Sequence, residues 1–165
     1  NLVLQKHPDA KLFFAGDGVL YNEMVNLIEK LNIKNSVKFL GWISQSQQTD
    51  LFARSSIFVQ HSITTEEGDA EGTPVAIIEA SASGLPIVST QIEGSGVSWV
   101  NQNNVTGISV PIKDSDSIAF AINKLLNDEK LYNEYSDNAL KRYQDLFTRK
   151  KMIDRANELY IKVLK

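Results

Sequence analysis

The sequence EGTPVAIIEASASGLPIVS, residues 71–89, contains a helix signal followed directly by a strand signal. Pro74 is the residue type preferred at the first position of a helix, and Thr73 before it is a favourable N-cap. We therefore expect a helix from Pro74 to Ser83. The apolar run Pro86–Ser89 that follows, bounded by glycine and proline, predicts a strand.

The same alternation of elements continues on both sides of this stretch. Short apolar runs predict four more strands, at residues 11–15, 37–40, 57–60 and 107–110. Segments of helical period occupy residues 21–31 and 46–54. Strands and helices that alternate with short connections favour a parallel sheet built from right-handed crossovers. The predicted fold class is α/β, a Rossmann-like, doubly wound parallel sheet with helices on both faces.

After the last predicted strand the sequence becomes entirely helical in period. Helices are expected at residues 117–126, 131–143 and 150–164, so the chain has a helical C-terminal tail. The last of them carries one apolar stripe, formed by Met152, Ile153, Ala156, Leu159, Tyr160, Val163 and Leu164. Packing in a core and binding of a partner are both compatible with this stripe.

Composition excludes several classes of function. The chain has 165 residues, 42% hydrophobic and 22% charged, which is typical of one globular domain. Its net charge is −3 and no Lys/Arg cluster alternates with aromatic residues, so we expect no nucleic-acid partner. The sequence has no cysteine, spanning apolar run or signal peptide. Cytoplasmic localisation is expected, and peripheral association of a full-length protein with the inner face of the cell membrane remains open.

The beginning of the chain has the character of an interior segment. Residue 1 is Asn1 rather than Met, and the first ten residues resemble the tail of a helix that Pro8 ends. We therefore expect residues 1–165 to form a single domain that is truncated at its N-terminus.

Ligand sites in an open α/β sheet lie beyond the carboxyl ends of the strands. The first such loop contains Gly16, Asp17 and Gly18, which resemble the beginning of a dinucleotide fingerprint without its third glycine. A tight turn in which Asp17 caps the next helix and a loop that faces a ligand both remain open. His61 and Ser62 lie at the end of the third strand, where His61 is interpreted as a strand-end residue, with a hydrogen-bond donor to the ligand as the alternative.

The helix that begins at Pro74 places its N-terminus on the ligand side, where free amides suit a phosphate or a sugar hydroxyl. Gly72 permits close approach of the backbone. Glu79 falls on the side of the helix that carries small residues, so we expect it to accept hydrogen bonds from a ribose diol. A salt bridge or an exposed glutamate is the alternative interpretation.

Two other interpretations of the acidic residues are disfavoured. The backbones of Glu71 and Glu79 differ by up to about 12 Å along a helix axis, which is unfavourable for the paired carboxylates of a glycoside hydrolase. The residues Glu66, Glu67, Asp69 and Glu71 do not follow the EF-hand order. We predict no metal site.

Residues 71–89 resemble the retaining glycosyltransferases of family four, which have the GT-B fold. Glu71 and Glu79 reproduce the pair of glutamates separated by seven residues that marks that family. The segments at residues 7–18, 37–41, 107–111 and 125–128 are also similar to it in order and spacing. The resemblance therefore covers nearly the whole chain.

The resemblance implies that this chain is the donor-binding, C-terminal domain of a two-domain enzyme. Glu71 would contact the donor sugar as the catalytic-site residue, Glu79 would accept hydrogen bonds from the ribose, and Trp42 would border the nucleobase. The other implied donor-binding residues are Gly16, Asp17, Gly18, Gly72, Thr73, Pro74 and Val75. The implied reaction is retaining transfer of a hexose from a nucleoside diphosphate sugar to a glycan or lipid acceptor, without a metal or other cofactor.

The sequence departs from the family pattern in two places. Residues 92–97, IEGSGV, replace the usual Gly-Gly turn, and the basic pair that neutralises the diphosphate is expected before residue 1. The acceptor-binding N-terminal domain is also expected there, so residues 1–165 alone should be inactive. A stand-alone donor-binding subunit with a separate acceptor-domain partner, and a degenerate module without ligand affinity, are the alternatives.

Overall fold

The computed structural model describes residues 1–65, 68 and 71–164, and these form two compact units, residues 1–53 and 54–165. All five predicted strands are present, and every pair of neighbouring strands is parallel. They form two sheets, one of two strands and one of three, where one sheet was predicted. That residues 1–165 form a single domain truncated at its N-terminus stays a prediction.

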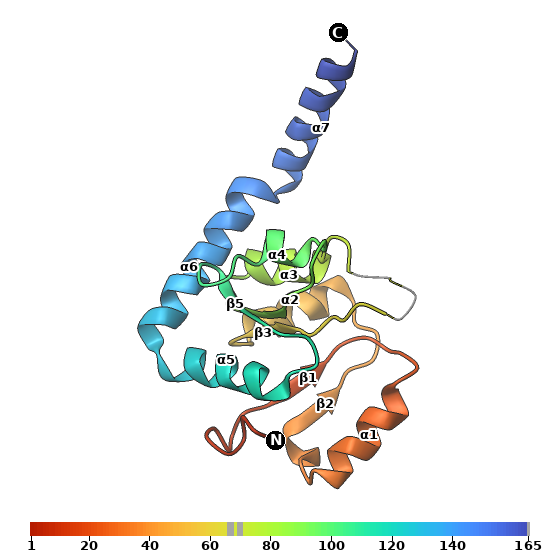
Figure 1. Cartoon of the computed structure of the whole chain (residues 1–165), viewed down its shortest axis with the longest axis vertical. Coiled ribbons are helices and arrows are strands. Elements are labelled where there is room, and N and C mark those ends of the chain that lie inside the picture. The colour runs from red at the N-terminus through yellow and green to blue at the C-terminus, as the bar shows by residue number, and fades with distance from the viewer. Residues whose placement is uncertain (66–67, 69–70, 165) are drawn as a thin grey trace. The chain divides into compact units, whose positions relative to one another are not determined.

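The first unit contains a two-stranded parallel sheet and two α-helices (Figure 1). Its elements are β1 (Leu12–Phe14), α1 (Tyr21–Lys30), the 3-10 turn η1 (Lys34–Ser36), β2 (Val37–Phe39) and α2 (Gln45–Ala53). The rings of Phe14 and Phe39 stack across the two strands at 5.2 Å, and Tyr21 packs edge-on against Phe39 at 4.9 Å. Helix α1 ends where Asn32 adopts a left-handed φ of 54°, which is typical of the residue after a helix.

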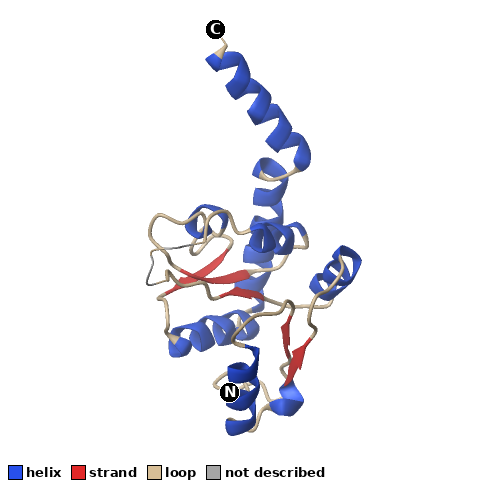
Figure 2. Cartoon of the chain, turned by 90° about the vertical axis from the view of Figure 1, so that its right-hand side faces the viewer, coloured by secondary structure: helices blue, strands red, loops and turns tan. Residues whose placement is uncertain are grey.

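The second unit contains the three-stranded sheet, in the order β3-β4-β5, and the remaining helices. Its elements are β3 (Phe58–Gln60), α3 (Val75–Ala82), β4 (Ile87–Thr90), α4 (Val97–Val100), β5 (Gly107–Val110), α5 (Ser115–Asn127), α6 (Glu129–Leu146) and α7 (Arg149–Val163). Helix α3 contacts β3 and β4, and α5 contacts β4 and β5. Figures 1 and 2 show these two helices on opposite faces of the sheet, which confirms the predicted α/β layering.

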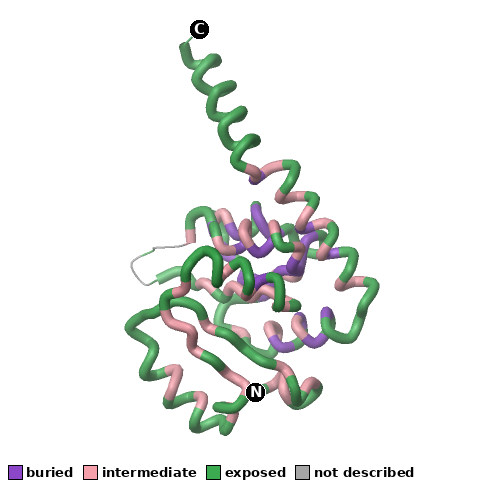
Figure 3. The backbone as a smooth tube through the Cα atoms, turned by 180° about the vertical axis from the view of Figure 1, so that it is seen from behind, coloured by how far each residue is buried: buried purple, intermediate pink, exposed green. Residues whose placement is uncertain are grey.

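The core of the second unit surrounds the central strand β4, all four residues of which are buried. Figure 3 shows the buried backbone concentrated in this strand and in the helices that cover it. One cluster joins β4, β5, α5 and α6 and consists of Val88, Val110, Ala121, Leu125 and Tyr135. Gly107 permits the close contact of β5 with β4, because a Cβ atom at this position would lie 1.9 Å from the carbonyl oxygen of Ile87.

Element boundaries agree with the sequence predictions to within a few residues, with three differences. Helix α3 begins at Val75 with Pro74 as its N-cap and without a side-chain cap, so the assignment of Thr73 as N-cap is wrong. Proline lacks a backbone N–H but its carbonyl is free to accept, and the Pro74 carbonyl accepts from the amides of Ile77 and Ile78. The short elements η1 and α4 were not predicted. The first ten residues form hydrogen-bonded turns without a helix.

Helix α7 extends from the end of α6 away from the sheet of its own unit (Figure 1). Each described residue of α7 is exposed, so the predicted apolar stripe is not packed in a core in this structure. Among the described residues, no helix has both the length and the apolar character required to cross a membrane.

Candidate functional site

A group of polar side chains lies at the carboxyl end of the three-stranded sheet, where a ligand site was predicted. Gln60 and Thr90 are the last residues of β3 and β4. The hydroxyl of Thr90 donates to the carbonyl oxygen of Ser62 at 2.5 Å. The Gln60 amide nitrogen donates to the Ser62 hydroxyl at 3.0 Å and to Oε2 of Glu71 at 3.3 Å. Glu71 is therefore connected to the end of β3.

The next residue of this loop, Gly72, is held by the loop that follows β4. The backbone N–H of Gly96 donates to the carbonyl of Gly72 at 2.8 Å. A Cβ atom on Gly96 would lie 2.2 Å from the same carbonyl oxygen, so the contact requires glycine at position 96. This defines a structural role for the IEGSGV segment at residues 92–97, whose part in the site the sequence left uncertain.

Helix α3 begins at Val75, three residues after Gly72. Pro74 is buried, Val75 is 60% exposed, and the first amides of a helix have no intrahelical acceptor. The positive end of the helix dipole therefore lies next to Glu71 and Gly72 in the chain, an arrangement that suits an anion or a hydroxyl ligand. Glu79 lies one helical turn after Val75 and is half-buried. It takes part in an interaction within the protein.

A buried polar network supports the loop that carries Gly96. The Asn101 amide donates to the Ser89 hydroxyl at 2.7 Å and accepts from the Thr106 hydroxyl at 2.9 Å. The C-terminal end of α4 is capped by Arg142, which donates to the carbonyls of Val100 and Trp99. Partial burial lowers the pKa of the Arg142 guanidinium. These bonds fix α4, and with it the end of the loop, to β4 and α6.

In the first unit the loops after β1 and β2 meet. The N–H of Gly16 donates to the carbonyl of Gly41 at 2.8 Å, and both glycines have positive φ angles, 115° and 61°. The Asp17 carboxylate accepts from the N–H of Gly18 at 2.8 Å, whereas the N-cap of α1 is Leu20 without a side-chain cap. The interpretation of Asp17 as a helix cap is therefore wrong, because its carboxylate closes the turn itself. Trp42 is 84% exposed.

The other candidate sites from the sequence are a metal site, the acidic loop and His61. No cluster of three or more His, Cys, Asp or Glu that could hold a metal ion occurs among residues 1–65, 68 and 71–164. The residues Glu66, Glu67 and Asp69 of the acidic loop lie outside the described residues, and His61 is exposed.

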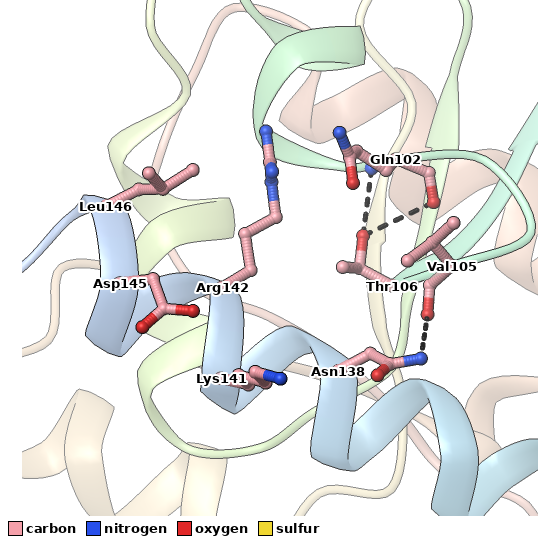
Figure 4. Close-up of a pocket in the computed structure, with 8 residues that line it drawn as sticks. All are labelled: Gln102, Val105, Thr106, Asn138, Lys141, Arg142, Asp145 and Leu146. Atoms are coloured by element: carbon pink, nitrogen blue, oxygen red, sulfur yellow. Dashed lines mark hydrogen bonds between the residues drawn. The ribbon is translucent and has the colours of Figure 1, made fainter.

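A cavity of about 330 Å³ lies between α6 and the segment that joins α4 to β5 (Figure 4). The segment precedes β5, so the cavity is at the amino end of that strand, away from the predicted site. It is lined by Gln102, Val105, Thr106, Asn138, Lys141, Arg142, Asp145 and Leu146. Of its two cationic side chains, Lys141 is exposed and the partly buried Arg142 already donates to the carbonyls at the end of α4, so the cavity offers little to an anionic ligand.

Comparison with solved structures identifies the class of fold. A solved structure of Anabaena HepE in complex with UDP matches 98% of this chain and 44% of its own with a TM-score of 0.81 and 20% sequence identity. At that identity the likeness shows the fold, the Rossmann-like half of a GT-B enzyme.

The family follows from the sequence comparison. A family model for glycosyl transferases group 1 matches residues 1–142, and the chain belongs to this family. Enzymes of this family use nucleotide-sugar donors, generally without a metal cofactor.

Two curated relatives come from Escherichia coli. O-antigen chain mannosyltransferase C is 30% identical over 152 residues, which are 91% of this chain and 39% of the relative. UDP-Gal:alpha-D-GlcNAc-diphosphoundecaprenol alpha-1,3-galactosyltransferase is 30% identical over 155 residues, 93% of this chain and 37% of the relative. The chain therefore spans less than half the length of either enzyme.

The structure adds residues that sequence reasoning missed. Gln60, Thr90 and Gly96 hold the Glu71 loop, and none of them was assigned a role beforehand. A signal existed for the first two, because each is a polar residue at the carboxyl end of a strand. Gly96 gave no such signal, since its requirement arises from a carbonyl that lies 24 residues earlier in the chain.

Proposed function

We propose that this chain binds the donor in the transfer of a hexose from a nucleoside diphosphate sugar. Glu71 contacts the sugar, backbone amides around Gly72, Thr73 and Val75 hold sugar hydroxyls or the diphosphate, and Glu79 accepts hydrogen bonds from the ribose. Pro74 contributes shape only. One observation carries the proposal: Gln60 and Gly96 hold Glu71 and Gly72 immediately before the N-terminus of α3.

The chemistry of such a site is electrostatic. Amides at the start of α3 favour negative charge that develops on the diphosphate as the glycosidic bond breaks, and preorganised donors of this kind stabilise a transition state without moving a proton. The reaction proceeds with retention of configuration. The predicted roles of Gly16, Asp17, Gly18 and Trp42 beside the diphosphate and nucleobase remain predictions of the family resemblance.

We also propose that turnover requires more sequence than residues 1–165. The curated relatives are more than twice as long as the matched segment, and their names specify glycan or lipid-linked acceptors. An acceptor glycan or lipid would bind to the additional part, and a lipid-linked acceptor would place the full-length enzyme at the inner face of the cell membrane. Sugar transfer by purified residues 1–165 would contradict this part of the proposal.

The donor assignment is tested by Glu79→Gln in the full-length protein. The amide keeps the shape of the side chain and one acceptor oxygen, but it removes the charge. Hydrogen bonds to charged groups contribute about 1.5–3 kcal/mol, so affinity for the preferred nucleoside diphosphate should fall roughly tenfold or more. Isothermal titration against UDP, GDP and TDP measures the change, and the melting temperature is measured on the same sample.

Glu134→Gln on α6 is the matched control, since Glu134 is an exposed helical glutamate of the same unit. It should change neither quantity. A Glu79→Gln protein with a lower melting temperature and unchanged nucleotide affinity would show a structural ion pair instead, and the ribose assignment would then be abandoned.

A further inference from the structure

The side chain of Gln60 has both of its amide hydrogens directed at acceptors. One donates to the Ser62 hydroxyl at 3.0 Å and the other to Oε2 of Glu71 at 3.3 Å. An ionised carboxylate can only accept hydrogen bonds, so the nitrogen of the Gln60 amide, not its oxygen, must face Glu71. In this contact Gln60 is therefore the donor and Glu71 the acceptor. The hydrogen bond holds the Glu71 carboxylate from the side of β3.

The constraint acts from the sheet toward the loop. Gln60 is paired with Ser89 in the parallel ladder between β3 and β4, and β4 is the buried centre of the unit. Ser62 is attached to the same sheet, because its carbonyl accepts from Thr90 at the end of β4. Glu71 belongs to an irregular segment, so its position depends on Gln60 rather than the reverse.

We propose that Gln60 is a positioning residue for the donor sugar, which it controls by orienting the carboxylate of Glu71. This inference rests on the proposed function, in which Glu71 contacts the sugar and other groups hold the nucleotide. The amide is neutral, so it orients Glu71 without cancelling its charge. A carboxylate offers about four acceptor sites, and one bond to Oε2 leaves capacity for sugar hydroxyls.

A selective effect on the sugar distinguishes this role from a general structural one. Gln60→Met keeps the length of the side chain and removes the donor. Binding of the intact nucleotide sugar should weaken about tenfold, as expected for the loss of one hydrogen bond to a charged group, whereas binding of the matching nucleoside diphosphate should stay within about twofold. Gln60→Glu replaces the donor with an acceptor and should reproduce the same selective loss.

The experiment is a double-mutant cycle in the full-length protein, with Glu71→Ala as the second change. Binding is measured by titration with the tightest-binding pair of nucleoside diphosphate and nucleotide sugar among the UDP, GDP and TDP compounds. In the Glu71→Ala background, Gln60→Met should have no further effect on nucleotide-sugar affinity. Gln91→Met is the control, since Gln91 follows β4 directly and its side chain is exposed.

The outcomes separate the two proposals. If the wild-type protein binds no nucleotide pair, the proposed function fails and this inference fails with it. If the wild-type protein binds and Gln60→Met weakens the nucleoside diphosphate as much as the nucleotide sugar, or adds its full effect to that of Glu71→Ala, Gln60 is a structural residue and the positioning role alone is overturned.

Discussion

Gly96 and Gly72 touch through their backbones, yet they differ in what a side chain would meet. A Cβ atom at position 96 would lie 2.2 Å from the Gly72 carbonyl oxygen, while a Cβ atom at position 72 has nothing within 4 Å. The clash at position 96 would be between a Cβ atom and a backbone oxygen, neither of which moves when a side chain changes rotamer. Gly96 is also held in place as the N-cap of α4. The need for glycine is therefore confined to one partner of the contact.

We expect Gly96→Ala to destabilise the second unit by roughly 1–3 kcal/mol, the usual cost of inserting a methyl group into a packed site. Gly72→Ala is the control and should leave the free energy of unfolding nearly unchanged. Thermal or urea denaturation of the two variants gives the comparison. A Gly96→Ala protein as stable as Gly72→Ala and wild type would mean that the contact between the two loops is absent in solution.

For single residues, the sequence predicts roles for Glu71 and Glu79 because their spacing is a local property of one segment, and these roles stay predictions. It could not identify Gln60 as the partner of Glu71, since the hydrogen bond joins residues 11 positions apart across a loop. It left Asp17 open between a helix cap and a loop that faces a ligand, because a short carboxylate before a helix can cap the helix or close its own turn.

Helix α5 begins with a charged cap whose effect depends on pH. The Asp114 carboxylate accepts from the Ser117 hydroxyl at 2.7 Å and from the Ser117 N–H at 2.9 Å. These two bonds, first that from the hydroxyl and then that from the amide, lower the pKa of Asp114 below its ordinary value of 3.8. The stabilisation is therefore complete above the ordinary pKa and is lost as the pH falls through the lowered one.

Asp114→Asn retains a capping oxygen and removes the titration, so it should reduce the loss of melting temperature between neutral and acidic pH. Asp114→Ala should lower the melting temperature even at neutral pH. The measurement is the melting temperature of the three proteins across the acid range. Parallel curves for wild type and Asp114→Asn would show that the cap does not contribute to acid sensitivity.

Elements were predictable where their residue pattern is long enough to show a period. All five strands and six helices were found within a few residues of their bounds, because apolar runs and helical stripes are visible in one dimension. The four-residue helix α4 is too short to display a period. The start of α3 was misplaced by one residue because Pro74 is compatible with both the N-cap and the first helical position.

At the scale of the whole molecule, helix α7 carries an uncovered apolar surface. Its exposed side chains include Met152, Ile153, Leu159, Tyr160 and Val163. Contiguous apolar patches of this kind favour association. We expect residues 1–165 to self-associate with increasing concentration, and Leu159→Glu combined with Val163→Glu to suppress this.

Sedimentation velocity over a range of concentrations tests this expectation. Asn157→Glu is a suitable control, because it adds charge to α7 at a residue that is not apolar. A wild-type chain that remains monomeric at every concentration would show that the stripe does not drive association.

The fold class was predictable from the alternation of strands and helices, but the division into two sheets was not. The strands are only three or four residues long, and alternation indicates which segments are strands without indicating which of them form hydrogen bonds to one another. Pairing is a property of the folded backbone, in which β1 pairs with β2 and β4 pairs with both β3 and β5.

The hydrogen bond from Gly96 to Gly72 also makes motion of the loop that carries Glu71 measurable by amide hydrogen exchange. An amide proton exchanges with solvent only while its bond is broken, so the exchange rate at Gly96 reports how often the two loops separate. A nucleotide that rests on residues 72–75 would hold the loops together and slow this exchange. The exchange rate of this one backbone proton, measured without any label on the ligand, thus reports how often the two loops of the site separate.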